Sequence, residues 1–337
     1  MFLSIGMLKQ KYFLTDIFIL SAEKQPIKLS WRKIEWLLIE AHTDVEQLIR
    51  LCEVLVLSGD VFIHVDKKTK DPKFWNRLNL YKKKNNKITI ISHRQFVSWG
   101  GYSQVECFKS LLTIVLNSTT KYERILLLSG LDYPIYSPQN IQKFFTLNAE
   151  KEYVCGYNVT TCPYQMHLHK IRYYHFFRDV PLPHKSIFRK DLIGGSMLLL
   201  KYLGFRRKTY LLINGKQWDI YFGSSWIGIT RNCAKYILNQ LLTNKSLIRY
   251  SKNSYAPDEL CVPTIVMNSS FADKAIQVDE LDFTKATPLH YLNYVNYIWS
   301  YNEKDFTTIM SSGKLFVRKI ISGKSEKLIE MIKETWK

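Results

Sequence analysis

The chain has 337 residues, of which 46% are hydrophobic, 14% aromatic and 23% charged, so it can bury a full core and is not typical of a disordered protein. Its 48 lysines and arginines outnumber 29 acidic residues and give a net charge of +19, which favours polyanionic partners such as nucleic acid, anionic lipid or a phosphorylated substrate. Because the sequence has no CxxC zinc pairing, no RNP-like aromatic motif and no heptads after a basic region, nucleic acid is not an expected partner.

The first 33 residues are treated as an N-terminal extension. Residues 12–20 are apolar, but they include Asp16 and are too few to span a membrane, which takes about 20 residues. No small-residue cleavage site follows a long apolar core, so we expect neither a signal peptide nor a transmembrane helix. The six cysteines show no CxxC spacing and indicate reduced core thiols. We expect a cytoplasmic protein, with peripheral contact to the inner membrane face as a possibility.

Residues 34–147 alternate between short apolar runs and amphipathic segments. We predict strands at 34–41, 61–66, 87–92 and 123–130, and helices at 44–59, 71–84, 103–118 and 137–147. Strands that alternate with helices indicate βαβ units and a largely parallel sheet. Short apolar strands without strict polar alternation are typical of a sheet that helices cover on both faces.

The second half of the chain is less regular. Residues 155–222 are rich in Tyr, His and Arg and show weak periodicity. They are followed by the apolar segment 224–230, a predicted helix at 231–243, a helix behind Pro257, a strand at 314–320 and an amphipathic helix at 325–337. With no repeat or low-complexity linker, we predict an α/β fold in a single domain over residues 34–320. Its central sheet is mostly parallel and flanked by helices, and residues 321–337 form a C-terminal amphipathic helix.

Polar and aromatic residues follow each predicted strand of the first half. His42 follows the first strand, His64 and Asp66 end the second, the loop SWGGYS with Trp99 follows the third, and SGLDYP with Asp132 follows the fourth. Ligands of open α/β sheets bind beyond the carboxyl ends of the strands. Turn chemistry explains each cluster taken alone. Their joint placement is what predicts one edge of the sheet lined for a ligand.

Several common catalytic motifs are absent. The sequence has no GxGxxG after a strand, no GxxxxGK[ST] and no GxSxG, so it predicts neither a dinucleotide-binding fold, nor a P-loop, nor a nucleophile elbow. His167 and His169 form an HxH pair, but without HExxH or an acidic partner a surface or packing role is preferred over metal binding. No Asp-x-Asp pair occurs anywhere in the chain.

The segment YAPDEL at 255–260 places two adjacent carboxylates, Asp258 and Glu259, directly behind Pro257. A helix start explains this pattern, because proline suits the first turn and acidic side chains there complement the helix dipole. A positioned general base would show the same pattern. From these residues alone both interpretations stay open.

Seven segments in series resemble one known family. They are WLLIEAHTDVEQLIRL, FIHVDKKT, VSWGGYSQVEC, ILLLSGLDYPI, GSSWIGITRNCAKYIL, APDELCVPTIV and LFVRKI, which together run from about residue 34 to 320. In order and spacing they are similar to the core-2/I-branching beta-1,6-N-acetylglucosaminyltransferases and peptide O-xylosyltransferases. The most specific are SWGGYS, LLSGLDYP and PDE.

The resemblance implies a GT-A-type nucleotide-sugar transferase fold. Enzymes of this family use a UDP-sugar, invert the anomeric centre and need no divalent metal, which agrees with the missing Asp-x-Asp pair. The family's base, the glutamate of PDE, falls on Glu259. Its diphosphate lysine falls on Lys319 within FVRKI. A basic residue of the family falls on His290 in LHYLNY, so the second phosphate contact is in doubt, and Arg318 is a candidate to replace it.

The remaining site residues are assigned by position. We expect His42, Asp66 and Trp99 on the uridine side and Asp132 near the donor sugar. Tyr221 and Trp226 flank GSS and are candidates to stack on an acceptor sugar, although core packing is an equal alternative for each. Asp258 is expected to brace the helix beside Glu259, on the acceptor side of the site.

The expected activity is therefore metal-independent, inverting transfer of GlcNAc or xylose from a UDP-sugar to a hydroxyl of a glycan or lipid-linked saccharide. Two alternatives remain: a glycan- or membrane-binding module that kept the fold without turnover, supported by His290, and a basic nucleic-acid-binding protein, supported by charge only. For membrane contact, the amphipathic tail 325–337 is the candidate segment.

Overall fold

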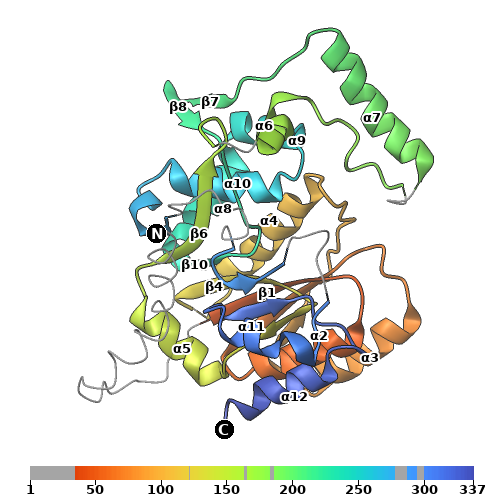
Figure 1. Cartoon of the computed structure of the whole chain (residues 1–337), viewed down its shortest axis with the longest axis vertical. Helices are drawn as coiled ribbons and strands as arrows, with labels where there is room; N and C mark the ends of the chain where they lie inside the picture. The colour runs from red at the N-terminus through yellow and green to blue at the C-terminus, as the bar shows by residue number, and fades with distance from the viewer. Residues whose placement is uncertain (1–34, 121, 163–164, 183–185, 278–286, 294–299) are drawn as a thin grey trace, which may run out of the picture.

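A computed structural model describes residues 35–120, 122–162, 165–182, 186–277, 287–293 and 300–337, without the side chains of 35–36 and 165–166. The N-terminal extension predicted at 1–33 lies outside the described residues. Figure 1 shows a central sheet with helices on both sides of it and a helical excursion, α7, at one end of the molecule.

The first half of the chain forms the βα alternation that its sequence predicts. Its strands run parallel in the order β3-β2-β1-β4, with Leu38 opposite both Phe62 and Leu127. The largest boundary difference is at the first helix, which ends at Leu55 because Gly59 already pairs in the next strand. The elements are β1 (Glu35–Ala41), α2 (Val45–Leu55), β2 (Gly59–Val65), α3 (Pro72–Lys83), β3 (Ile88–Ile90), α4 (Ser103–Leu116), β4 (Arg124–Ser129) and α5 (Pro138–Leu147).

The second half completes the sheet with strands of mixed direction. β10 lies between β4 and β6 and is antiparallel to both, and β9 pairs antiparallel with β6 at the far side. The strands and short 3-10 turn of this part are β6 (Glu152–Asn158), β9 (Tyr221–Gly223), β10 (Gly228–Thr230), η1 (Ala272–Lys274) and β11 (Ala275–Ile276). The central sheet is thus mostly parallel in its first half, as predicted, and mixed in its second.

The weakly periodic region holds more regular structure than its sequence indicates. Its elements are α6 (Gln165–Arg172), α7 (Ile187–Tyr202) and the antiparallel hairpin β7 (Tyr210–Ile213) and β8 (Lys216–Asp219). Three helices follow it: α8 (Arg231–Thr243), α9 (Lys245–Lys252) and α10 (Asp258–Met267), of which α8 confirms the predicted helix at 231–243 and α10 the helix behind Pro257.

Helix starts follow local capping chemistry. Asp71, Ser137 and Thr230 each accept a hydrogen bond from a backbone N–H in the first turn of α3, α5 and α8. A proline follows Asp71 and Ser137 at the first helical position, where its missing N–H costs nothing. The sequence therefore encodes these helix boundaries locally.

Helices cover both faces of the sheet, as the apolar strands predict. Leu38 and Leu127 point into the core cluster formed with α4, α8 and α10. Leu37 and Leu126 point into the opposite cluster, formed with α2, α3 and α5. Consecutive strand residues alternate between these two cores, so a charged residue within a strand has no solvent face to occupy.

A second, three-stranded sheet packs beside the central one in the order β12-β13-β5. The segment SGLDYP contains a turn at 130–131, and behind it Asp132 to Pro134 pair antiparallel with Arg318 to Phe316. The strand predicted at 314–320 is confirmed over Phe316–Arg318. The elements of this part are β5 (Asp132–Pro134), β12 (His290–Tyr291), η3 (Glu303–Asp305), α11 (Phe306–Met310), β13 (Phe316–Arg318) and α12 (Glu326–Glu334).

The apolar face of the C-terminal helix α12 is buried inside the molecule. Leu328, Ile329 and Ile332 are buried in the core of the small sheet. Beyond the helix, the Trp336 ring stacks on Tyr133 with ring centroids 6.1 Å apart. The predicted amphipathic helix is confirmed, but its apolar stripe is covered by protein and does not face outward.

No helix among the described residues is long and apolar enough to cross a lipid bilayer. All six cysteines are buried and carry free thiols.

Candidate active site

His42 and Asp66 follow β1 and β2 at the carboxyl edge of the parallel strands. His42 is exposed, whereas Asp66 is buried and its Oδ1 accepts a hydrogen bond from the Lys68 backbone N–H at 2.9 Å. Partial desolvation lowers the pKa of His42, and the charges of Arg318 and Lys319 lower it in the same direction. The end of β13 therefore brings two cations to the edge where His42 lies.

Asp132 lies at the centre of a buried charge cluster. Its carboxylate accepts a hydrogen bond from Ser129 N at 2.7 Å and lies 2.9 Å from His290 Nε2 and 3.1 Å from Arg318 Nη1. Burial by itself raises the pKa of Asp132, but His290 and Arg318 outweigh burial and the pKa is lowered. The Asp132 side chain is completely buried, so its contacts orient Arg318 and do not face open space.

His290, on which the family resemblance places a basic residue, belongs to this cluster. The His290 side chain is completely buried and stacks on Phe316, with ring centroids 5.3 Å apart. Because no surface of this imidazole is open, its contact is with Asp132. Arg318, with a side chain that is 11% exposed, is the basic neighbour of Lys319 that reaches the surface.

Lys319 lies just beyond β13, and no hydrogen bond or ion pair to its ammonium group is present in the part of the chain that the structure describes. Desolvation and the nearby charge of Arg318 lower the pKa of Lys319. A half-buried ammonium group without a described protein partner is suited to an external anion.

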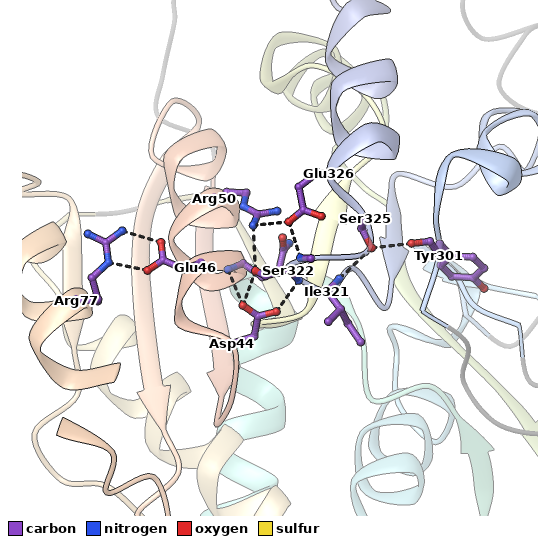
Figure 2. A network of polar contacts seen from close by, with 11 residues as sticks. Asp44, Glu46, Arg50, Arg77, Tyr301, Ile321, Ser322, Ser325 and Glu326 are labelled. Atoms are coloured by element: carbon purple, nitrogen blue, oxygen red, sulfur yellow. Dashed lines mark hydrogen bonds and ion pairs between the residues drawn. The ribbon is translucent and has the colours of Figure 1, made fainter. Parts of the chain in front are cut away.

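A polar network ties the segment behind Lys319 to the start of α2. Figure 2 shows Ser322 donating to the Asp44 carboxylate from its backbone N at 2.8 Å and from its Oγ at 2.6 Å. In the same view Arg50 bonds to Ser322 Oγ and to Glu326, each at 3.0 Å. Asp44 also caps α2 by accepting from Gln47 N. The network anchors the chain three residues after Lys319 to the corner that follows His42.

The loop SWGGYS packs against two distant segments. Gly100 has φ +71°, which favours glycine, and its carbonyl accepts a hydrogen bond from Ala256 N at 3.2 Å. A Cβ atom at Gly101 would collide with the Asp179 carboxylate. That carboxylate accepts from Tyr102 N at 2.9 Å and Ser103 N at 3.0 Å, and so caps α4 from 76 residues away along the chain. The paired glycines allow this close approach.

Trp99 lies on this loop between the two parts of the site. Its ring is 59% exposed and meets Tyr255 edge-on, with centroids 5.7 Å apart. Two residues earlier, Val97 N lies 3.4 Å from Asp66 Oδ1. The loop therefore runs from the expected uridine side to the residues just before Pro257.

The PDE segment is a helix start, and Glu259 faces a cation there. Asp258 and Glu259 occupy the first turn of α10, and Ala256 before them has the uncommon left-handed φ of 49°. The Glu259 side chain is 30% exposed and pairs with Lys170 Nζ at 3.1 Å. Lys170 is held over the Phe222 ring at 3.9 Å. Glu259 is thus accessible and oriented, as a general base requires.

Asp258 turns inward from the same helix start. Its Oδ2 accepts hydrogen bonds from Ser225 Oγ at 2.6 Å and Gln104 Nε2 at 3.1 Å, which agrees with the predicted bracing role. With Glu40 it lines a cavity of about 30 Å³, large enough for one or two waters. Desolvation, then the neighbouring Glu259, raises the pKa of Asp258 to about 7.

Trp226 joins the two halves of the site. The Arg318 guanidinium lies over its ring at 4.6 Å, and the ring also lines the cavity shared by Asp258 and Glu40. Tyr221 lies on β9, where its backbone N–H donates to Thr264 Oγ1 of α10 at 3.1 Å. Trp226 therefore contacts Arg318 and shares a cavity with Asp258 and Glu40, and the strand that carries Tyr221 is attached to α10.

Sequence reasoning missed Lys170 and Glu40. Lys170 lies 89 residues before Glu259 in the weakly periodic region, where no local pattern marks it. Glu40 could have been found from the sequence, because a charged residue inside the apolar run WLLIEA is unusual. The HxH pair does not form a metal centre in the described residues: His167 is buried and lies 2.9 Å from the Tyr157 hydroxyl, and no group of three potential ligands occurs there.

A family model and two known proteins that are similar to this chain point to the same family. The family model for the Core-2/I-Branching enzyme matches residues 38–309, which include Glu259 but end before Arg318 and Lys319. Human N-acetyllactosaminide beta-1,6-N-acetylglucosaminyl-transferase is 22% identical over 293 residues, which cover 83% of this chain and 66% of that protein.

A mouse relative, beta-1,3-galactosyl-O-glycosyl-glycoprotein beta-1,6-N-acetylglucosaminyltransferase 4, is 24% identical over 233 residues, 67% of this chain and 45% of its own length. The chain thus spans about two thirds of one relative's length and under half of the other's. The matched range covers most of the α/β fold and the helix start that carries Glu259, so the chain belongs to the Core-2/I-branching enzyme family.

Proposed function

We propose that this protein is an inverting glycosyltransferase that moves a sugar, GlcNAc or xylose, from a UDP-sugar to a hydroxyl of a glycan acceptor. The family and the names of its relatives support transfer of N-acetylglucosamine first. The observation that carries the proposal is the position of Trp226. Its ring meets the Arg318 guanidinium, and it lines a cavity together with Asp258, the residue before Glu259 at the start of α10.

The proposed reaction is a single in-line displacement. Glu259 takes the proton of the acceptor hydroxyl, and the oxygen attacks the anomeric carbon of the donor sugar. The bond between that carbon and the UDP oxygen breaks, and UDP leaves with the electron pair from the opposite face. The transition state resembles an oxocarbenium ion, as in glycoside hydrolysis. The result is a beta linkage, UDP and a protonated Glu259 that returns its proton to solvent.

Protein cations are proposed to meet the charge that develops on UDP. Lys319 has no described protein partner, and Arg318 is fixed beside it by Asp132. A fixed cation at the leaving group stabilises the transition state because it needs no reorganisation as charge develops. We therefore propose that transfer needs no divalent metal. His42 and Asp66 line the same edge and are proposed to hold the uridine, with Trp99 beside them.

The acceptor is proposed to be a saccharide at a membrane surface, with the enzyme in the cytoplasm and attached peripherally. The net charge of +19 supports contact with anionic lipid. A catalytically inactive binding module remains the alternative, but its sequence support, His290, is explained by the buried contact with Asp132.

Glu259→Gln tests the assignment of the base. Transfer from a UDP-sugar should fall about 10²–10⁴-fold, the usual effect of losing a general base, while UDP affinity stays unchanged because the carboxylate faces the acceptor. Glu46→Gln, at an exposed carboxylate of α2 paired with Arg77, is the matched control and should keep full activity. Near-normal turnover in Glu259→Gln would reduce Glu259 to a helix-start acid. Failure of the unaltered protein to release UDP from any UDP-sugar would favour the binding module.

A further inference from the structure

The helix α7 and the turn behind it leave most of their apolar side chains uncovered. Of the fifteen large hydrophobic side chains that are exposed in the described residues, seven lie between 187 and 205. They are Ile187, Phe188, Leu198, Leu199, Tyr202, Leu203 and Phe205, with exposed fractions from 54% to 89%. Such a concentration of exposed apolar surface marks an interaction site.

The intrinsic helix propensity of its residues does not explain why α7 is stable as a helix. Within α7 only Arg189 and Ile193 are buried, so little packing holds it. Gly194 and Gly195 lie in its middle, and a Cβ atom at either position would meet nothing within 4 Å. A mid-helix glycine costs about 1 kcal/mol relative to alanine, and here no close contact requires it. The helix therefore lacks, within the described residues, the packing partner that stabilises most protein helices.

Charge identifies the kind of partner. Among the exposed residues of 186–208, Lys190, Lys201, Arg206 and Lys208 are basic and Asp191 alone is acidic. Exposed apolar side chains beside lysines and arginines favour an anionic lipid surface, which can bury the apolar groups and attract the cations. A second copy of this chain, also at +19, would repel the same surface.

Both ends of this excursion are attached next to the candidate active site. On the entry side, Arg189 donates to the carbonyl of Arg178 at 2.8 Å, and Arg178 lies over the Tyr255 ring at 4.1 Å. On the exit side, Arg207 donates to Asn253 O at 2.8 Å and to Ser254 Oγ at 3.0 Å. Residues 253–255 lead directly into the turn that carries Glu259.

The C-terminal tail is a poor alternative for membrane contact. The apolar face of α12 is buried against the small sheet. In Figure 1, α7 and α12 lie at opposite ends of the longest axis of the molecule, so they are separate surfaces that can be altered one at a time.

We propose that residues 186–208, the α7 surface, lie on an anionic lipid bilayer and hold the acceptor side of the active site next to it. The inference rests on the proposed function for its acceptor, a saccharide carried at the membrane. Binding of the surface to lipid is a separate property and can be measured without any transfer assay.

The test uses the full chain and sedimentation with vesicles of pure phosphatidylcholine or of equal parts phosphatidylcholine and phosphatidylglycerol. The unaltered protein should bind the anionic vesicles and be released by salt. Leu198→Glu combined with Leu199→Glu should weaken this binding at least tenfold. The variant loses the two leucines that would be buried in the bilayer, and it places two acidic side chains against anionic lipid. Both side chains are exposed, so the fold should tolerate the change.

Two matched controls locate the contact. Leu242→Glu changes a leucine of α8 that is 56% exposed and should leave vesicle binding unchanged. Lys327→Glu combined with Lys333→Glu removes two exposed cations of α12 and should reduce binding only slightly. Equal loss in the α12 variant, or normal binding in the α7 variant, would overturn the proposal.

Light scattering tests the alternative that the α7 surface binds a second copy of this chain and not lipid. If the unaltered chain dimerises in solution, the α7 variant is monomeric and neither binds vesicles, the surface contacts a second copy and the proposal is wrong. UDP binding should be the same in all these variants. Absence of UDP binding together with α7-dependent vesicle binding would refute the proposed function and leave the membrane surface standing.

Discussion

Arg318 and Lys319 are adjacent cations with different surroundings. Arg318 is bonded to the buried Asp132 and lies over Trp226, whereas Lys319 has no described side-chain partner. Lys319→Ala should weaken UDP binding by about 1.5–3 kcal/mol, the range for a hydrogen bond to a charged group, with little change in folding stability. Isothermal titration calorimetry with UDP and urea unfolding measure the two effects.

Arg318→Ala is the contrasting variant. It removes one partner of a completely buried carboxylate, so the free energy of unfolding should fall by about 1.5–3 kcal/mol. Its loss of UDP affinity should be smaller than that of Lys319→Ala if Lys319 makes the main phosphate contact. Equal UDP affinities in Arg318→Ala and Lys319→Ala would contradict the proposal that Lys319 makes the main phosphate contact.

Glu40 should make folding stability depend on pH. Burial, then the charge of Asp258, raises the pKa of Glu40 to about 8 from an ordinary value of 4.5. A carboxyl that binds its proton more tightly when folded contributes stability that is complete below about pH 4.5 and is lost as the pH rises through about 8. The unaltered protein should therefore lose stability across this window.

Glu40→Gln should flatten that dependence, because the amide is neutral throughout. Asp258 titrates in the same direction, so the slope should shrink and not vanish. Urea unfolding at several pH values in the window provides the measurement, with Glu53→Gln at an exposed position of α2 as the control. An identical slope in Glu40→Gln and the unaltered protein would contradict this assignment.

At the scale of elements, the corner between β1 and α2 positions the segment that carries Lys319. Asp44→Ala removes the cap of α2 and both hydrogen bonds to Ser322 (Figure 2). Loss of the cap should cost about 1 kcal/mol of stability. Loss of the two bonds should free the chain behind Lys319 and weaken UDP binding severalfold, measured by calorimetry.

Asp71→Ala separates these two effects. Asp71 caps α3 by accepting from Lys73 N at 2.9 Å, and its described bonds do not involve the C-terminal segment. Its substitution should lower the melting temperature, though less than Asp44→Ala because only a cap is lost, and should leave UDP affinity intact. A similar loss of affinity in both variants would show that general destabilisation, not anchoring of Lys319, causes it.

At the scale of the whole molecule, UDP should stabilise the fold without any metal. A ligand at 100 times its Kd stabilises the state that binds it by about 2.7 kcal/mol. Thermal unfolding with saturating UDP should show the same shift in excess EDTA as in Mn²⁺ if, as proposed, Lys319 and Arg318 meet the phosphates. A shift that requires Mn²⁺ would assign this work to a metal and overturn metal-independent transfer.

The sequence by itself determined what local chemistry encodes. Apolar runs separated by capped amphipathic segments predicted the alternation from β1 to α5, because strand burial and helix capping depend on residues close together in the chain. The series from SWGGYS to PDE identified the family. The same motif placed Glu259 in the first turn of a helix, where α10 has it.

Only the tertiary structure decided the contacts between distant segments. Lys170 meets Glu259 across 89 residues, and Asp132 meets Arg318 across 186, so no local pattern could pair them. It also showed that strand β5 follows the turn in SGLDYP, and it decided which of two helices, α7 and α12, is covered by the rest of the chain. The face of α12 is buried by the small sheet, while α7 remains exposed, because burial of an apolar stripe depends on which surface the rest of the chain brings to it.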